Sequence, residues 1–146
     1  EGSPQDWRAV VLEDASVQGS SPLGWAQHAV DAMARWGAEG LVAEVNQGGD
    51  LVETVIRQID PLVPVTKVHA TRGKAARAEP VAALYEQGRV RHLPGLDALE
   101  DQMCAMTVQG FQGKNSPDRL DALVWALTEA LLVPAAAWRR PRLRVL

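Results

Sequence analysis

The chain has 146 residues, of which 47% are hydrophobic and 23% are charged, and its formal net charge is −3. This length and composition predict one globular domain with a sizeable core. No apolar run reaches the ~20 residues of a membrane span and no signal peptide opens the chain, so we expect no membrane contact. The single Cys104 excludes an internal disulfide framework and any cysteine-rich zinc site, which fits a reducing cytoplasm.

Basic and acidic side chains are unevenly distributed along the chain. Residues 67–91 carry six basic and two acidic side chains, whereas residues 1–66 carry three basic and ten acidic ones. The net acidity argues weakly against nucleic-acid binding. An acidic body with a basic segment nevertheless suits a site that combines metal-binding carboxylates with phosphate contacts, and a chance distribution is the alternative.

Strand and helix patterns alternate over the first two thirds of the chain. Short apolar runs predict strands, and apolar residues at three- and four-residue spacing predict helices. The predicted elements are a strand at 8–13, a helix at 22–36, a strand at 41–45, a helix from 50 through 59, a strand at 65–70, a helix around 79–87, a strand at 90–93 and a helix at 96–106. This alternation predicts an α/β fold with parallel central strands, whose ligands bind beyond the carboxyl ends of those strands.

A further helix begins after the loop at 108–115. Ser116 is a favoured N-cap residue, and Pro117 suits the first helical position because it needs no hydrogen-bond donor there. An apolar stripe that should face the core is formed by Leu120, Leu123, Val124, Leu127 and Leu131. After this helix the chain becomes alanine-rich and then basic, so we expect a domain over 1–133 and a basic tail over 134–146.

Two carboxylates lie on the other face of this helix. At ~100° per residue, Asp118, Asp121 and Trp125 fall together opposite the apolar stripe. Carboxylates one turn apart can share a hard cation such as magnesium or manganese. The alternative for Asp118 is a favourable interaction with the helix dipole, which has faded by Asp121. Packing is the simpler role for Trp125.

Glu44 stands near the carboxyl end of a predicted buried strand. An unpaired charge there would cost several kcal/mol, so the side chain needs a partner. A buried salt bridge with Lys67 or an arginine is one interpretation. Together with Asp118 and Asp121, Glu44 would instead complete the oxygen-rich ligand set of a magnesium site.

A basic loop follows the next predicted strand. Arg72, Lys74 and Arg77 could hold a phosphodiester backbone, and a solvated basic loop is the alternative. The three histidines have no metal-ligand spacing, and we assign them no chemistry.

Five segments, taken in order, resemble one protein family. They are Glu-Val-Asn-Gln-Gly-Gly-Asp at 44–50, Arg-Gly-Lys-Ala-Ala-Arg-Ala-Glu-Pro-Val at 72–81, Leu-Tyr-Glu-Gln-Gly-Arg-Val at 84–90, Leu-Glu-Asp-Gln-Met at 99–103 and Ser-Pro-Asp-Arg-Leu-Asp-Ala-Leu-Val-Trp at 116–125. Over residues 8–132 the chain resembles the C-terminal nuclease domain of the terminase large subunit. This subunit is the DNA-packaging motor of tailed bacteriophages, prophages and gene transfer agents.

The resemblance implies a fold, an activity and a set of partners. The family has a ribonuclease H-like, resolvase-like fold, in which helices flank a mixed sheet. It cuts concatemeric double-stranded DNA in the bacterial host cytoplasm, using two metal ions, Mg²⁺ or Mn²⁺. The partners implied are double-stranded DNA, the portal, the small terminase subunit and the ATPase domain of the same full-length protein. A docking module for DNA or the portal that does not cut is the alternative.

The resemblance also assigns roles to individual residues. Glu44 matches the acidic residue of the central strand, Asp118 and Asp121 match the acidic positions that open the last helix, and Lys74 matches a basic residue beside the catalytic centre. We therefore expect the carboxylates of Glu44 and of Asp118 or Asp121 to converge within about 4 Å, as a shared or paired metal site requires.

One strand of the family pattern has no counterpart in this sequence. The family's leading aspartate lies on a strand before the one at 8–13, and only seven residues precede that strand here. We therefore expect a partial nuclease domain that binds magnesium poorly, accepts manganese better and cuts DNA slowly or not at all.

Overall fold

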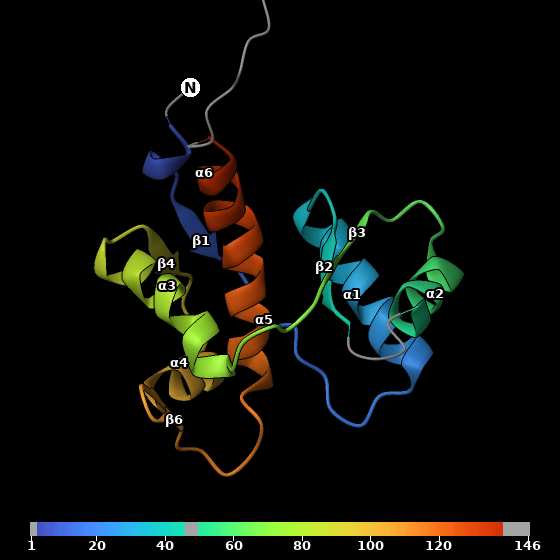
Figure 1. Cartoon of the computed structure of the whole chain (residues 1–146). Coiled ribbons are helices and arrows are strands. Elements are labelled where there is room, and N and C mark those ends of the chain that lie inside the picture. Colours follow the sequence, from blue (N-terminus) through green and yellow to red (C-terminus); the bar gives the residue numbers. More distant parts are fainter. Residues whose placement is uncertain (1–2, 46–49, 139–146) are drawn as a thin grey trace, which may run out of the picture. The chain divides into compact units, whose positions relative to one another are not determined.

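The computed structural model of the protein describes residues 3–45 and 50–138 (Figure 1). Its contacts separate into two compact units. The terminal unit comprises residues 1–13 and 74–146, and the central unit comprises residues 14–73. Each has its own cluster of buried apolar side chains, so the units are described one at a time.

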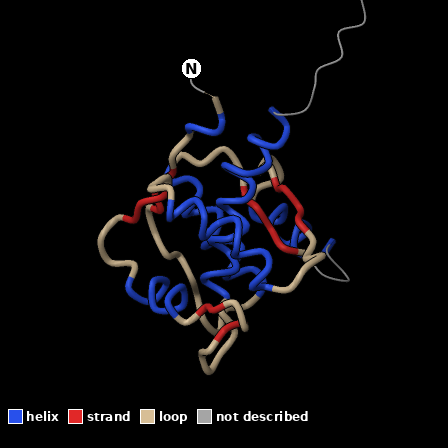
Figure 2. The backbone as a smooth tube through the Cα atoms, turned by 60° about the vertical axis from the view of Figure 1, so that its left-hand side comes forward, coloured by secondary structure: helices blue, strands red, loops and turns tan. Residues whose placement is uncertain are grey.

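Short strands alternate with longer helices in both units, which confirms the α/β class (Figure 2). The described strands form three two-stranded sheets. Two of these sheets are parallel, as predicted, and the third is an antiparallel hairpin. Along the chain, the strands of one parallel pair are separated by a helix, and those of the other pair by the whole central unit and a further helix.

The central unit is a strand–helix–strand crossover with one additional helix. Its elements are α1 (Pro22–Trp36), β2 (Leu41–Glu44), α2 (Asp50–Ile59) and β3 (Val65–Val68). The bounds of α1 are those predicted, because Ser21 Oγ accepts the Gly24 N–H (3.1 Å) and Gly37 ends the helix with φ of 61°. Strands β2 and β3 are parallel, with Glu44 opposite Val68.

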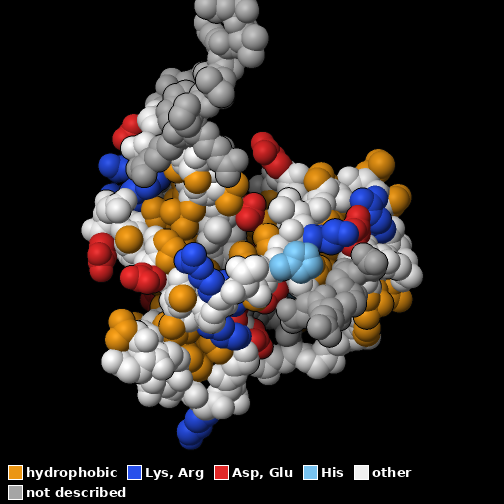
Figure 3. Space-filling model, in the orientation of Figure 1, with side chains coloured by type: hydrophobic (Ala, Val, Ile, Leu, Met, Phe, Trp, Pro, Cys, Tyr) orange, Lys and Arg blue, Asp and Glu red, His pale blue; other side chains and the backbone are white. Residues whose placement is uncertain are grey.

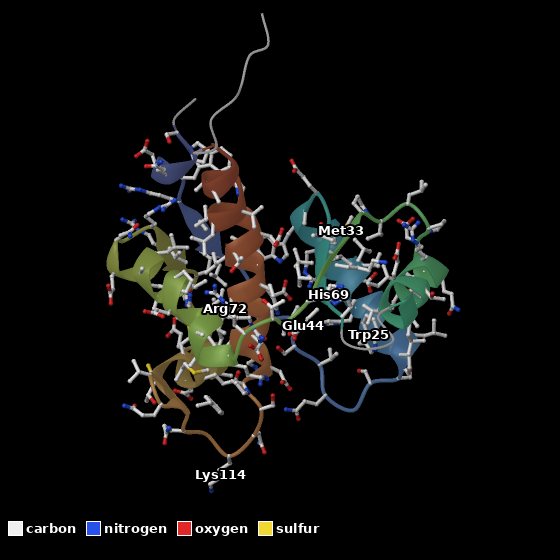
Figure 4. All side chains as sticks on the ribbon, viewed as in Figure 1. Trp25, Met33, Glu44, His69, Arg72 and Lys114 are labelled. Carbon is white, nitrogen blue, oxygen red and sulfur yellow. The ribbon has the colours of Figure 1, made fainter. Side chains whose placement is uncertain are left out.

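The core of the central unit lies among its two helices and two strands. Ala26, Val55, Ile56 and Val63 are buried there. Trp25 and Met33 of α1, which Figure 4 labels, pack against this cluster. The unit therefore presents the carboxyl ends of β2 and β3 on a packed scaffold.

The terminal unit joins the start of the chain to its second half. Its elements are the short 3₁₀ helix η1 (Pro4–Asp6), β1 (Ala9–Val11), α3 (Lys74–Glu86), β4 (Val90–His92), α4 (Asp97–Cys104), β5 (Met106–Thr107), β6 (Gly110–Phe111), α5 (Asp118–Leu127), the π-helical turn η2 (Thr128–Leu132) and α6 (Val133–Trp138). Strand β1 pairs in parallel with β4. The predicted apolar stripe of α5 is buried, together with Val81 and Leu84 of α3.

Three boundaries in this unit differ from the predictions. Helix α3 begins at Lys74 and not around residue 79, so Lys74 and Arg77 are helical. A hairpin over 106–111 overlaps the first half of the loop predicted at 108–115, because Met106 pairs with Phe111 and Thr107 with Gly110.

The tail predicted from residue 134 is also helical as far as Trp138. Helix α5 continues through η2 into α6 as one rod (Figure 1). The Val133 N–H bonds to the Thr128 C=O, which gives this turn its π spacing. The arginines of the predicted tail lie outside the described residues.

Several large apolar side chains are open to solvent, among them Val108, 91% exposed, and Leu62, 86% exposed. Figure 3 shows apolar side chains on the surface of both units. No helix among the described residues is long and apolar enough to cross a membrane.

A hydrogen-bonded chain of three side chains links α3, β4 and α4. Tyr85 Oη lies 2.7 Å from His92 Nε2, and His92 Nδ1 lies 2.9 Å from Glu100 Oε1. The Tyr85 and His92 rings meet edge to face, with centroids 5.5 Å apart. Burial, reinforced by the negative charge of Glu100, raises the pKa of Tyr85 to about 12.

We predict that Tyr85, the single tyrosine of the chain, ionises near pH 12 in the folded protein. Folding raises this pKa, so the neutral phenol contributes fully to the free energy of unfolding below pH ~10, the pKa of tyrosine in the unfolded chain. This contribution is lost as the pH rises through the pKa of Tyr85 in the folded protein. The ultraviolet absorbance of tyrosinate, followed during a pH titration, measures the pKa of Tyr85 in the folded protein. Glu100→Gln should lower the pKa, and titration near the ordinary tyrosine value in the native state would contradict the prediction.

Candidate functional site

The first turns of α3 and α5 meet in a cluster of charged side chains within the terminal unit. Asp121 of α5 is buried. Arg77 Nη2 lies 2.9 Å from Asp121 Oδ1, and the Lys74 ammonium contacts Oδ2 of the same carboxylate. Two cations from α3 therefore hold the two oxygens of one buried carboxylate.

The burial of Asp121 corrects the sequence interpretation of this helix. The helical wheel placed Asp121 opposite the apolar stripe, on the face where Asp118 and Asp121 were predicted to share a cation. In the structure, α3 packs against α5 and brings Lys74 and Arg77 onto that face. The wheel gives the angle between side chains, but it does not show which neighbouring helix covers them.

Asp118 remains exposed and is linked to the cluster through Ser116. The Ser116 hydroxyl donates to Asp118 Oδ1 and accepts a hydrogen bond of 3.1 Å from Lys74 Nζ. The prediction that Ser116 caps the helix is wrong. Pro117 is the N-cap residue, with no side-chain cap, and its C=O accepts the Asp121 N–H at 2.9 Å.

Arg77 and Lys74 differ in how firmly they are held. The Arg77 side chain is 10% exposed, and its Cζ lies 5.1 Å from the centroid of the Trp125 ring, at cation–π distance. The Lys74 side chain is 41% exposed. Arg77 is therefore fixed between a carboxylate and an aromatic face, whereas the Lys74 stem can reach solvent.

The arrangement of charge favours anions near the cluster. Lys74 and Arg77 lie in the first turn of α3, where the helix dipole already produces a positive potential. Asp118 and Asp121 in the first turn of α5 balance the charge of these two cations. The four side chains together carry no net charge, so an approaching phosphate meets two helix N-termini and a partly exposed ammonium group.

The donors of this cluster suit a hard divalent ion, but Lys74 occupies part of the position. Asp118, Asp121 and Ser116 supply oxygen atoms, which Mg²⁺ and Mn²⁺ prefer. Unit charges ~4 Å apart interact by about 4 kcal/mol at an effective dielectric constant of ~20, so a divalent ion beside the ammonium would meet a repulsion of about 8 kcal/mol. The ion and the bound ammonium therefore cannot share Oδ2 of Asp121.

Glu44 lies at the carboxyl end of β2 in the central unit, where the sequence placed it. It is half-buried and stands opposite Val68, the last residue of β3, which His69 follows (Figure 4). Lys67, a predicted partner, forms a 2.8 Å ion pair with Glu53 of α2. Glu44 and the two aspartates belong to different units, so their convergence stays a prediction.

The three predicted phosphate contacts have different surroundings. Arg72 is exposed and belongs to the central unit, whereas Lys74 and Arg77 lie one turn apart on α3. Arg77 is largely buried against Asp121, and its contact with DNA stays a prediction. Within the described part of either unit, no group of three His, Cys, Asp or Glu side chains could hold a metal ion.

Sequence reasoning missed the link between Ser116 and Lys74 and the pairing of Arg77 with Asp121. The partners are 42 and 44 residues apart, so no local spacing reveals them. The predicted helix began around residue 79, so the unfavourable position of two cations in the first turn of α3 was not visible in the sequence either.

Comparison with known proteins gives one match. Residues 5–130 match a family model described as the terminase RNaseH-like domain. This match confirms the resemblance and the ribonuclease H-like fold predicted from the sequence. No curated protein sequence and no solved structure matches the chain.

The cluster generates a stability prediction. Arg77→Ala should lower the free energy of unfolding by about 1.5–3 kcal/mol, because the buried carboxylate loses one charged hydrogen-bond partner while Lys74 stays on its other oxygen. Arg57→Ala is the matched control, since Arg57 pairs with Glu53 at 2.8 Å but is 51% exposed, and it should cost less than about 0.5 kcal/mol. Urea denaturation of both variants measures the difference, and equal losses would contradict the prediction.

Proposed function

Because the chain belongs to the terminase RNaseH-like domain family, we propose that it is the metal-dependent DNA endonuclease domain of a DNA-packaging terminase. The observation that carries the proposal is the pair of aspartates at the start of α5, with the Lys74 ammonium on one of them. This cluster combines oxygen donors for a cation with a positive group for a phosphate.

Each residue of the proposed site has a separate task. Asp118, Asp121 and Glu44 would hold Mg²⁺ or Mn²⁺. The chemistry supplied by two bound ions would be activation of water for in-line attack and stabilisation of the leaving oxygen. Arg77, fixed on Trp125, keeps Asp121 Oδ1 in one orientation. Lys74 is the cationic side chain of the cluster that can reach a phosphodiester oxygen.

The partners follow from the family and from the basic side chains. Double-stranded DNA would contact Arg72 and Lys74, the two exposed or half-exposed cations around the start of α3. A packaging motor also needs an ATPase domain, a portal and a small terminase subunit, and we propose these as partners of the full-length protein.

One observation favours a second candidate function. Asp121 is already neutralised by two cations from its own fold. A cluster in this state could bind DNA phosphate or a portal surface without any metal ion. The domain would then dock the motor to its substrate and leave the cutting to another site.

Plasmid nicking distinguishes the two functions. In the natural polypeptide that contains this sequence, we expect nicking that requires Mn²⁺ or Mg²⁺. Asp118→Asn and Glu44→Gln should each slow it by roughly a hundredfold or more, because a metal ligand contributes several kcal/mol to the transition state. Glu53→Gln, which alters an acid paired with Arg57 and Lys67, is the control and should cut normally. DNA binding with no metal-dependent nicking would favour the docking function.

The DNA path has its own test. Arg72→Ala should weaken DNA binding and reduce the slope of log affinity against log salt by about 0.9, because one phosphate contact no longer releases a counterion. Arg57→Ala removes an equal charge from α2 and should leave the slope unchanged. Fluorescence anisotropy across a salt series measures both, and an unchanged slope for Arg72→Ala would exclude this path.

A further inference from the structure

The geometry points to Lys74 as a resident cation that a divalent ion must displace from Asp121. In this inference, which rests on the proposed metal-dependent function, metal binding is an exchange of one cation for another. The ammonium would leave Oδ2 of Asp121 and free that oxygen to hold a metal ion, while Arg77 stays on Oδ1. The exchange is a property of the terminal unit alone, because all three residues belong to it.

The first argument is that the two cations on Asp121 are held unequally. Arg77 is 10% exposed and stacked on Trp125, so its removal would break a buried ion pair and a ring contact together. Lys74 is 41% exposed and ends in a flexible stem, so its ammonium group can return to water. Lys74 is therefore the cation that leaves.

The second argument is that Lys74 already contacts the donor atoms that a metal ion needs. Its ammonium touches Asp121 Oδ2 and donates to Ser116 Oγ, which in turn donates to Asp118. An ion bound by Asp118 and Asp121 would lie within this chain of contacts. Ammonium and metal ion thus compete for the same oxygen atoms, and their mutual repulsion prevents both from binding at once.

The third argument concerns charge. With Lys74 in place the four side chains are neutral overall, and a neutral cluster attracts a divalent ion weakly. Once Lys74 withdraws, the remaining Asp118, Asp121 and Arg77 carry one net negative charge. The local charge becomes favourable only when the ammonium has left, so Lys74 sets the apparent metal affinity.

Mn²⁺ affinity of lysine variants is the first measurement. Lys74→Met keeps the apolar stem and removes the competing charge, so it should bind Mn²⁺ at least roughly fivefold more tightly than the unaltered protein, the equivalent of one half-exposed ion pair. Lys67→Met is the matched control, because Lys67 is 39% exposed and also pairs with a carboxylate, that of Glu53. The control should change Mn²⁺ affinity by much less. Electron paramagnetic resonance of free Mn²⁺ gives the affinities.

Amine labelling is the second measurement, and it reports on Lys74 directly. The chain contains three lysines, Lys67, Lys74 and Lys114. Saturating Mg²⁺ or Mn²⁺ should increase the labelling of Lys74 as detected by mass spectrometry and leave the other two unchanged. Lys114, which projects from the loop before α5 (Figure 4), serves as the exposed reference. Asp121→Asn should raise Lys74 labelling without any metal.

The outcomes separate this inference from the proposed function. If the protein binds Mn²⁺ but Lys74→Met binds it no more tightly than Lys67→Met, and Lys74 labelling is unaffected by metal, the exchange is overturned while the nuclease proposal stands. If neither the unaltered protein nor Lys74→Met binds Mn²⁺, both are overturned. Tighter binding by Lys74→Met, together with metal-dependent exposure of Lys74, supports the exchange.

Discussion

The terminal unit depends on the neutralisation of one buried carboxylate, that of Asp121. A lone ionised carboxylate at this depth would be costly, and Arg77 and Lys74 remove that cost by pairing with its two oxygens. Both cations come from the first turn of α3. Because both cations must reach Asp121, the first turn of α3 lies against the first turn of α5, and the two helix N-termini are close together.

Apolar packing supports this arrangement from the other side of the helices. A cavity of about 120 Å³ remains among α3, α4 and α5, lined by apolar side chains and by Tyr85. Beside it, Tyr85, His92 and Glu100 tie α3 to β4 and α4 through two hydrogen bonds. The buried ion cluster and the hydrogen-bonded chain thus hold α3 at both its ends, with the apolar core between them.

In the central unit, the carboxyl ends of two parallel strands position Glu44, the metal ligand proposed for this unit. In a strand–helix–strand crossover these ends lie side by side, which is why Glu44 and the residues after Val68 share one edge. Glu53 and Lys67 form an ion pair within the same unit, and the hydrogen bonds from Lys67 and Arg57 lower the pKa of Glu53. This unit therefore positions Glu44 by backbone pairing, whereas the terminal unit positions Asp121 by charge.

Local patterns in the sequence determined most of the helices and strands of this protein, because capping residues and apolar periodicity act within a few residues. Helix α1, with Ser21 before it and Gly37 after it, has the predicted bounds, and the α5 stripe is buried as expected. The ordered family motifs also determined the ribonuclease H-like class. Only the tertiary structure decided the state of Asp121. Its partners lie more than forty residues away, and the electrostatic energy of a carboxylate depends on which charges surround it in space, which no local spacing encodes.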